Sequence, residues 1–568
     1  MTKIVTILDF KMNQIICSDF LCFVPPDTAS STIKIFGFSE FLASLALLVV
    51  IFTVSDIRYK FRISVAPIPL YGITFFIISL TGIGSLISDV WVSQKWWVIK
   101  SDINFRIWFQ SLLGFLFLSC FMLWVYYAFI APPRFGRRNY ERYINSLYSI
   151  ILRGNKNELA VIADELGLSA ERIVSLGGVN KTAVAYAAND IMLLIANRRF
   201  CKVISNESPI TAYKFFEAMS SKNKYDVPLN QFSAMISEEV LMNKESVIYH
   251  EDNGYNSGLM GYNQEWSRAI YGNSCLIDCF NGQFRSPLEM DYKIYYLLDS
   301  EQWEAYGRLI CIYLEDLGRK KTFLTKSYTL ARVLQEFKQC TSKLYCLNDN
   351  IEDGLKSEIT KKTMVSIQFI NSIFTLVKAN KLNTSRVTYR YVKGKWKNDI
   401  SDDIADFMFN IVIQASRVRS LDFITWEIQN NIVWSGLLDG MDFLDGEENS
   451  DLYKKSCKKL IRLIYDEIKE IGTRPNYKNI RLAGMLLNIF GLKMNGQYIN
   501  KGKQLRFLKL VTIDTVRKHY LYLVEELPSI AEHMLGGGIS FDADSKSLIK
   551  TYTSFLRKKP VQDILRLE

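Results

Sequence analysis

The sequence predicts an all-α protein, with three transmembrane helices followed by a large, mostly helical cytosolic domain that forms an irregular helical array. Three observations lead to this prediction. The 568-residue chain has three long apolar runs close to its N-terminus. Beyond them, apolar residues recur at helical spacing, with short polar breaks between the periodic segments. No sequence period of fixed length is present, which argues against a strict repeat family.

The apolar runs define a transmembrane region at 36–133, after a short N-terminal leader at 1–35. A bilayer core about 30 Å thick requires about 20 mostly apolar residues in one helix. We expect spans at about 36–54, 65–88 and 107–131. Pro67 and Pro69 lie at the start of the second span, where a missing N–H costs least. The first run reaches spanning length only by including Phe36–Glu40, so a re-entrant segment is the alternative there.

Lysine and arginine residues near the ends of the runs predict the orientation, because cytoplasmic loops carry an excess of both. One side holds Arg58, Lys60, Arg62, Arg134, Arg137, Arg138 and Arg142, whereas the other side holds Lys34, Lys95, Lys100 and Arg106. We therefore expect a multi-pass protein of a bacterial inner membrane, with the lipid bilayer as a partner. Its N-terminus would lie outside the cell, where Cys17 and Cys22 could form a disulfide. Residues 134–568 would be cytoplasmic.

Apolar stripes at helical spacing run through the region at 134–568. One stripe comprises Val365, Phe369, Ile370, Ile373, Phe374 and Val377. Another comprises Leu460, Ile461, Ile464, Ile468 and Ile471. Gly472 and Pro475 then provide a helix stop signal. Helices this apolar must be buried against neighbours, which predicts the helical array.

Composition and motifs argue against an enzyme. The chain has only 3 histidines, and its 10 cysteines show no framework of paired metal ligands. A Gly-Lys-Ser/Thr phosphate loop, a Gly-x-Ser-x-Gly elbow and a His-Glu-x-x-His motif are all missing from the sequence. Accordingly, we expect no catalytic residue, no cofactor and no metal site. A metal bound by His250, Glu251, Asp252, Cys275, Cys279 and Cys311 is disfavoured, because only one cysteine pair is closely spaced.

Cationic and aromatic residues alternate over 386–397, around Gly394, a pattern typical of a small β-hairpin. Such side chains together suit RNA bases or phospholipid head groups, although a solvated hairpin has the same pattern. The candidate patch for an anionic partner comprises Arg386, Arg390, Lys393, Lys395, Trp396 and Lys397.

Small and hydroxyl-bearing residues gather on one face of the second apolar run. The candidate pore or packing face comprises Ser79, Gly82, Gly84 and Ser85. Several copies of the chain could line a pore with this face, but close helix packing through small residues explains the same pattern. The three runs carry no charge at depth, which argues against a transporter or a pump.

Residues 158–176 are similar to the helix-turn-helix of bacterial regulators, with Gly167 in the turn and Ser169 capping the second helix. DNA binding requires several cationic contacts with the phosphate backbone. The second helix offers only Arg172, with Glu171 beside it. We therefore expect a helical hairpin that packs on its neighbours, and not a DNA-binding element.

In broad layout the chain resembles the uncharacterised inner-membrane proteins of bacterial prophages and defence islands, a resemblance of architecture that no motif residue carries. The short loops between the runs, the basic residues on the cytoplasmic side and the missing active-site motifs favour a non-enzymatic membrane-anchored interaction module. Its cytosolic domain would bind a protein partner or self-associate. The alternative is a membrane effector that forms a pore or depolarises the membrane. A third hypothesis is an unfamiliar enzyme that uses residues 249–285, with His250 and Asp252.

Overall fold

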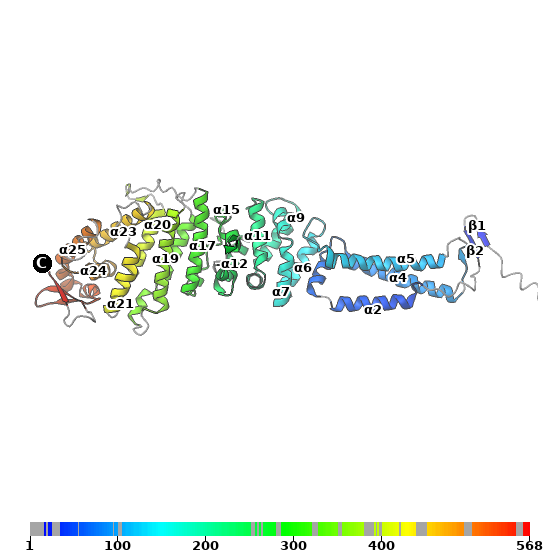
Figure 1. The fold of residues 1–568 in the computed structure, drawn as a ribbon, viewed down its shortest axis with the longest axis horizontal. Coiled ribbons are helices and arrows are strands. Elements are labelled where there is room, and N and C mark those ends of the chain that lie inside the picture. Colours follow the sequence, from blue (N-terminus) through cyan, green and yellow to red (C-terminus); the bar gives the residue numbers. More distant parts are fainter. Residues whose placement is uncertain are drawn as a thin grey trace, which may run out of the picture. The chain divides into compact units, whose positions relative to one another are not determined.

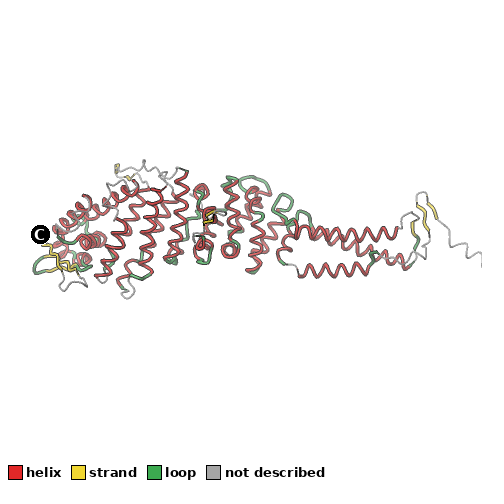
Figure 2. The backbone as a smooth tube through the Cα atoms, viewed as in Figure 1, coloured by secondary structure: helices red, strands yellow, loops and turns green. Residues whose placement is uncertain are grey.

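The computed structural model divides into two compact units, and helices dominate both (Figures 1 and 2). The mostly helical architecture confirms the predicted fold class at this level. The first unit comprises Met1–Ala218 and Asp226–Pro228, and the second comprises Met219–Tyr225 and Leu229–Glu568. The structure describes residues 16–18, 21–24, 35–54, 56–94, 96–99, 105–251, 256–257, 261–262, 265–279, 286–320, 328–349, 355–379, 391–392, 395–396, 400–419, 422–438, 451–493, 503–552 and 561–568.

The first unit contains the apolar helices and the helices that follow them. Its elements are β1 (Ile16–Ser18), β2 (Leu21–Val24), α2 (Phe38–Val54), α3 (Ile57–Ser64), α4 (Leu70–Ser93), β3 (Val98–Ile99), α5 (Phe105–Val125), the π-helix η2 (Tyr126–Ile130), α6 (Tyr140–Arg153), α7 (Lys156–Gly167), α8 (Ala170–Leu176), α9 (Ala183–Leu194), α10 (Arg198–Glu207) and α11 (Pro209–Ser221). Strands β1, β2 and β3 form an antiparallel sheet in that order. In its strand register, Cys17 of β1 lies opposite Cys22 of β2.

Helices α2, α4 and α5 lie side by side and alternate in direction (Figure 1). The start of α2 is tied to the end of α4, because the Phe38 N–H donates to Asp89 Oδ2 over 3.0 Å. The same end is closed by Gln110 of α5, whose amide donates to Ser88 Oγ over 3.1 Å and accepts the Ile35 N–H over 3.3 Å. These polar contacts fix the register of the three helices.

Two of the described helices, not three, are long and apolar enough to cross a membrane: Leu70–Trp91 and Phe105–Ile130. The expected first span is shorter, because α2 has 17 residues and a capped α3 begins directly after it. At 1.5 Å per residue α2 reaches about 26 Å, less than a bilayer core of about 30 Å. Helix α4 begins at Leu70, later than the expected start of the second span at about residue 65, because residues 65–69 are not helical.

The candidate pore or packing face contacts both neighbouring helices. A Cβ on Gly82 would lie 2.8 Å from the ring of Phe41 in α2, and one on Gly84 would lie 2.9 Å from Leu113 in α5. Ser85 is fully buried and its hydroxyl donates to the Gly82 carbonyl over 2.9 Å, whereas Ser79 is half-buried. Within one chain this face therefore packs helices together. A pore formed by several copies stays a prediction.

The second unit is a succession of helices with a small sheet at its C-terminal end. Its first elements are α12 (Asn230–Met242), α13 (Val247–His250), β4 (Asn256–Ser257), β5 (Gly261–Tyr262), α14 (Glu265–Tyr271), α15 (Ser274–Cys279), α16 (Tyr292–Tyr295), α17 (Ser300–Arg319), α18 (Tyr328–Phe337), the 3-10 helices η3 (Lys338–Thr341) and η4 (Leu344–Asn348), and α19 (Glu358–Ala379). The remainder are β6 (Tyr391–Val392), β7 (Lys395–Trp396), α20 (Ile400–Ala415), α21 (Asp422–Trp426), the π-helix η5 (Glu427–Ser435), α22 (Gly436–Leu438), α23 (Asp451–Glu470), α24 (Tyr477–Phe490), α25 (Lys503–Glu526), α26 (Pro528–Ala531), the 3-10 helix η8 (Glu532–Met534), β8 (Ile539–Asp542), β9 (Ser547–Tyr552) and β10 (Val561–Arg566).

Neighbouring helices of the second unit pack through the stripes that the sequence predicts. Helix α17 packs on α19, and α20 packs on α23. Every residue of the two predicted stripes is buried. An aromatic stack fills the space where α17, α18 and α19 meet, with Phe337 and Phe369 ring centroids 4.3 Å apart and Trp303 edge-on to Phe337.

The C-terminal sheet was not predicted. Strands β8, β9 and β10 form an antiparallel meander in which Ile549 pairs with Ser540 on one side and Ile564 on the other. Lys546 adopts a positive φ of 47° in the turn between β8 and β9. Leu548 and Lys550 are buried and Ile549 and Thr551 are less so, which is a strand pattern. This pattern is shorter and weaker than the preceding helical pattern.

Substituting Gly82 with Leu is expected to destabilise the three-helix packing, because the new side chain would overlap the Phe41 ring. Overpacking of this kind costs about 1–3 kcal/mol. The matched control is Gly72→Leu on the same helix, where no atom lies within 4 Å of the added Cβ. Thermal unfolding of the full chain in detergent should show a lower midpoint for Gly82→Leu only; equal midpoints for the two variants would contradict this packing.

Candidate functional site

The short helix α3 lies between the apolar helices α2 and α4 in the chain. It packs against α6 and α7, which follow α5, and we call this contact the joint. Asp56 begins α3 as an N-cap, accepting the Arg58 N–H over 3.4 Å. Helix α3 packs against α7, against α6 and against η2 at the end of α5. The joint therefore connects segments before and after the third apolar run.

An ion pair between Arg62 and Glu165 lies at the centre of the joint. Arg62 Nε donates to Glu165 Oε2 over 2.8 Å, and Nη2 donates to Oε1 over 2.6 Å. The remaining Nη1 donates to the Ala128 carbonyl of η2 over 2.7 Å. The Arg62 side chain is 13 % exposed and that of Glu165 is 6 % exposed. The hydrogen bond with Glu165 raises the pKa of Arg62, which holds the positive charge in this site.

Side chains of α6 and the segment before it hold the turn at residues 65–69. Asn139 Nδ2 donates to the Val65 carbonyl over 2.7 Å, and Arg142 Nη2 donates to the Pro67 carbonyl over 2.8 Å. Backbone carbonyls in this turn lack the partners that a helix would provide, so these donors satisfy them. In the sequence Arg62 and Arg142 indicate membrane orientation, and in the structure both also make specific protein contacts.

Apolar packing surrounds the polar centre of the joint. The Phe61 and Phe135 rings lie edge-on to the buried Tyr143 ring, at centroid distances of 5.4 and 5.5 Å. Burial raises the pKa of the Tyr143 hydroxyl, so it stays neutral. A second group of buried residues joins α3, α4, α5 and η2: Ile63, Ala66, Leu70, Trp124 and Ala128. The joint is therefore enclosed by protein on both sides of the ion pair.

The segment similar to a helix-turn-helix belongs to the joint. Glu165 of α7 pairs with Arg62, and Gly167 is close enough to α11 that a Cβ would lie 3.0 Å from Thr211 Oγ1. Ser169 lies at the N-cap of α8 as expected, but its hydroxyl makes no capping hydrogen bond and instead accepts the Phe135 N–H over 3.1 Å. Ala170, Ile173 and Val174 of α8 are buried. The hairpin therefore packs on its neighbours.

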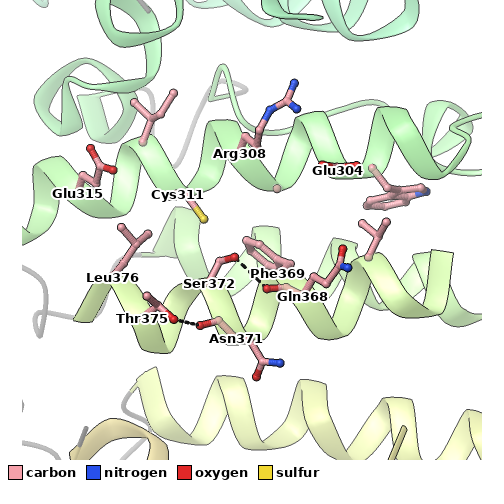
Figure 3. A pocket seen from close by; sticks show the side chains of 14 residues that line it. Glu304, Arg308, Cys311, Glu315, Gln368, Phe369, Asn371, Ser372, Thr375 and Leu376 are labelled. Carbon is pink, nitrogen blue, oxygen red and sulfur yellow. Dashed lines mark hydrogen bonds between the residues drawn. The ribbon is translucent and has the colours of Figure 1, made fainter. Parts of the chain in front are cut away.

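A groove of about 680 Å³ lies between α17 and α19 in the second unit. Trp303, Val365 and Phe369 line it with apolar surface. In Figure 3 the Cys311 sulfur is directed toward α19, whereas Arg308 and Glu315 point away from it. Polar side chains of α19 also line it: Gln368, Asn371, Ser372 and Thr375. The sequence showed the buried stripe of α19 but not the open space beside it.

The groove has the chemistry of a binding surface. Burial, with Glu315 nearby, raises the pKa of the Cys311 thiol to about 12, so the thiolate nucleophile is not populated at neutral pH. Histidine is not among the described residues that line it. The Ser372 and Thr375 hydroxyls donate to the carbonyls of Gln368 and Asn371, over 2.9 Å each. The groove could therefore hold a ligand through apolar contacts and hydrogen bonds.

The remaining sequence candidates are only partly described. Backbone pairing of Tyr391 with Trp396 and of Val392 with Lys395 forms the hairpin expected at 386–397. The other candidate anion contacts, Arg386, Arg390, Lys393 and Lys397, lie outside the described residues. Asp252 also lies outside them, and His250 is exposed at the end of α13. Within the described part of the chain no group of metal-ligating side chains gathers.

The joint could have been suspected from one feature of the sequence. Glu165 lies among apolar residues that are all buried on α7: Leu159, Ile162, Ala163 and Leu166. An acidic residue in an apolar stripe requires a cationic or hydrogen-bonding partner. Its partner is 103 residues away, so the pairing itself leaves no local pattern.

Removing Glu165 should destabilise the protein by about 3–5 kcal/mol, because the Arg62 charge stays buried without its carboxylate. Removing Arg62 should cost less, because Arg58 Nε lies 3.6 Å from Glu165 Oε1 and stays as a partner. The double variant Arg62→Ala, Glu165→Ala should lose much less than the sum of the single variants. Lys156→Ala is the control, since its pair with Glu207 is exposed and contributes at most about 1 kcal/mol. Chemical unfolding in detergent measures all four variants, and additive losses would show that the pair is not coupled.

Comparisons of the whole chain with known proteins add no relative: no protein-family model, no curated protein and no solved structure matches it.

Proposed function

We propose that this protein is a membrane-anchored, non-enzymatic interaction module of a bacterial inner membrane. Helices α4 and α5 would cross the bilayer, α2 would be inserted beside them, and the N-terminus would lie outside the cell. The C-terminal region would lie in the cytoplasm and present the α17–α19 groove to a protein partner or a second copy of the chain. The neutral thiol and the apolar floor of the groove support binding over catalysis.

The observation that carries the proposal is the distribution of side chains on α4 and α5. It is the reverse of the distribution on a helix of a soluble protein, which faces its apolar side chains inward. Small and polar residues of α4 face its helical neighbours, whereas large apolar side chains face outward. Phe75, Ile83, Phe115 and Leu118 are 75 %, 60 %, 65 % and 55 % exposed. Soluble monomers rarely expose large contiguous apolar surface, but lipid solvates such a surface readily. Only 22 % of the most apolar stretch of either helix is buried, unlike a core helix.

The joint supports an anchoring role. It ties the loop between α2 and α4 to the helices after α5, so these segments must lie on one side of a bilayer that α4 and α5 cross. This pairing agrees with the lysine and arginine distribution that predicts a cytoplasmic side at Arg58, Lys60 and Arg134. A rigid connection would keep the first helices of the soluble bundle at a defined distance from the membrane surface.

Charged substitutions at the middle of the apolar faces test the membrane proposal. Ile83→Lys and Leu118→Lys should each reduce the amount of full-length protein that stays in the membrane pellet after an alkaline carbonate wash. A lysine at the centre of a span costs about 2.5–3.5 kcal/mol of insertion free energy.

The control for this experiment is Leu193→Lys, which changes an apolar residue that is also about half exposed, but on α9. Its pellet fraction should match the wild type. Improved solubility of Ile83→Lys and Leu118→Lys, with wild-type protein recovered in the wash supernatant, would refute the membrane proposal.

The alternative proposal is a membrane effector whose apolar helices assemble and leak ions. It is favoured by the buried polar residues that run along one face of α4: Thr74, Thr81, Ser85 and Ser88. If several copies assembled with this face of α4 turned toward one another, these residues could line a polar path for ions. Helix α4 would first have to release its present contacts with α2 and α5. An interaction module requires no such rearrangement.

Membrane potential during induction distinguishes the two proposals. For an effector, a potential-sensitive dye should report depolarisation with the wild type and with Gly72→Leu, but not with Gly84→Leu, whose added side chain would meet Leu113. An unchanged potential at matched membrane expression favours the interaction module. Depolarisation that persists in Gly84→Leu would exclude a path along this face of α4.

A further inference from the structure

Three arginines and one histidine from separate segments gather in the second unit. Arg417 and Arg419 follow α20, Arg481 lies on α24, and His533 lies on η8. Arg481 Nε donates to His533 Nδ1 over 3.3 Å, and Arg419 Nη1 donates to the Glu532 carbonyl over 3.3 Å. All four side chains are half-buried. We call these four residues the arginine cluster.

Within the described part of the chain, the carboxylate nearest the arginine cluster is that of Glu532, which is exposed and acts on His533. Arg462 and Arg517 of the same unit pair with carboxylates, but none of the three arginines of the cluster forms an ion pair there. Burial lowers the pKa of Arg481, and the nearby Arg419 and Arg417 lower it further. The pKa of His533 is lowered by burial, by Arg419 and by Arg481, and the Glu532 carboxylate offsets this only in part. Cations held together this way repel one another unless an anion joins them.

Side-chain amides hold the backbone that carries two of these arginines. Asn348 Nδ2 donates to the Arg417 carbonyl over 2.9 Å, and Asn348 Oδ1 accepts the Arg419 N–H over 2.7 Å. Val418 between them is fully buried, and its carbonyl accepts from Gln429 Nε2 over 3.0 Å. The segment is therefore fixed in place before any ligand binds, which lowers the entropic cost of binding.

Aromatic rings orient two of the guanidinium groups. Arg417 lies over the Tyr345 ring at 4.5 Å from its centroid, and Arg481 lies over the Tyr477 ring at 5.6 Å. A guanidinium held over a ring keeps its N–H donors in the guanidinium plane. Arg417 Nη1 donates to Gln414 Oε1 over 3.0 Å and Arg481 Nε donates to His533, which leaves the other N–H groups of each arginine for a ligand. Such oriented forks match the oxygen spacing of a phosphate group.

We propose that the arginine cluster binds the diphosphate or triphosphate group of a small molecule. Several oriented guanidinium groups in one place favour an anion with more than one negative charge and many acceptor oxygens. The cluster is compact and half-buried, which fits one small anion better than the extended backbone of a nucleic acid, whose binding uses a basic stripe or face. Binding would neutralise the repulsion that the cluster carries when empty.

Titration calorimetry of the full-length protein in detergent tests the proposal, with inorganic pyrophosphate and ATP as probes at low ionic strength. The wild type should bind pyrophosphate, and Arg419→Gln and Arg481→Gln should each weaken binding by about tenfold or more. Equal affinities for pyrophosphate and ATP would assign recognition to the phosphates alone. Tighter binding of ATP would add a contact with the nucleoside.

The matched control is Arg566→Gln, which removes one exposed arginine charge from β10 and should leave the affinity unchanged. Thermal unfolding without ligand identifies a variant that fails to fold, and Arg419→Lys then serves as the substitute, because it keeps the charge but loses the fork. Absence of pyrophosphate binding by the folded wild type would overturn the proposal. So would equal weakening by Arg566→Gln, or binding of a single-stranded oligonucleotide without binding of pyrophosphate.

Discussion

The buried pairing of Arg62 with Glu165 is the constraint on which the architecture of the first unit depends. Taking two charges out of water costs several kcal/mol per ion, and only good geometry offsets this cost. Here both carboxylate oxygens accept from the guanidinium, and its third nitrogen reaches the Ala128 carbonyl. One side chain therefore links α3, α7 and η2. Few alternative arrangements would satisfy the same groups, so the pair favours a single geometry.

Local patterns in the sequence predicted much of the architecture. The stripe from Val365 to Val377 and the stripe from Leu460 to Ile471 are buried, because a helix must turn one face inward along its whole length. The helical character of the chain follows from the same periodicity. Two apolar helices were also evident from length and composition. These features depend on neighbours within a few turns, which is the information that a single sequence carries.

Features made by distant residues could not be predicted. Arg62 and Glu165 are 103 residues apart, and the arginine cluster joins residues after α20, on α24 and on η8. The groove depends on how α17 and α19 pack against each other, which no periodicity encodes. The C-terminal sheet was missed because each of its strands has at most 6 residues, too short for alternation to stand out beside long helical patterns. Helix α2 ends at Val54, as the expected first span does, but it begins at Phe38 and is therefore shorter than expected.

The short α2 would cause hydrophobic mismatch if the three apolar helices share one bilayer. The spanning segments of α4 and α5 have 22 and 26 residues, or about 33 and 39 Å, against about 26 Å for α2. The longer helices would tilt to fit a core of about 30 Å, whereas lipid would thin locally around α2. A fraction of a kcal/mol per ångström of mismatch is enough to sort proteins among membranes of different thickness. The protein would therefore favour thinner membrane regions, or lateral association that shields α2 from lipid.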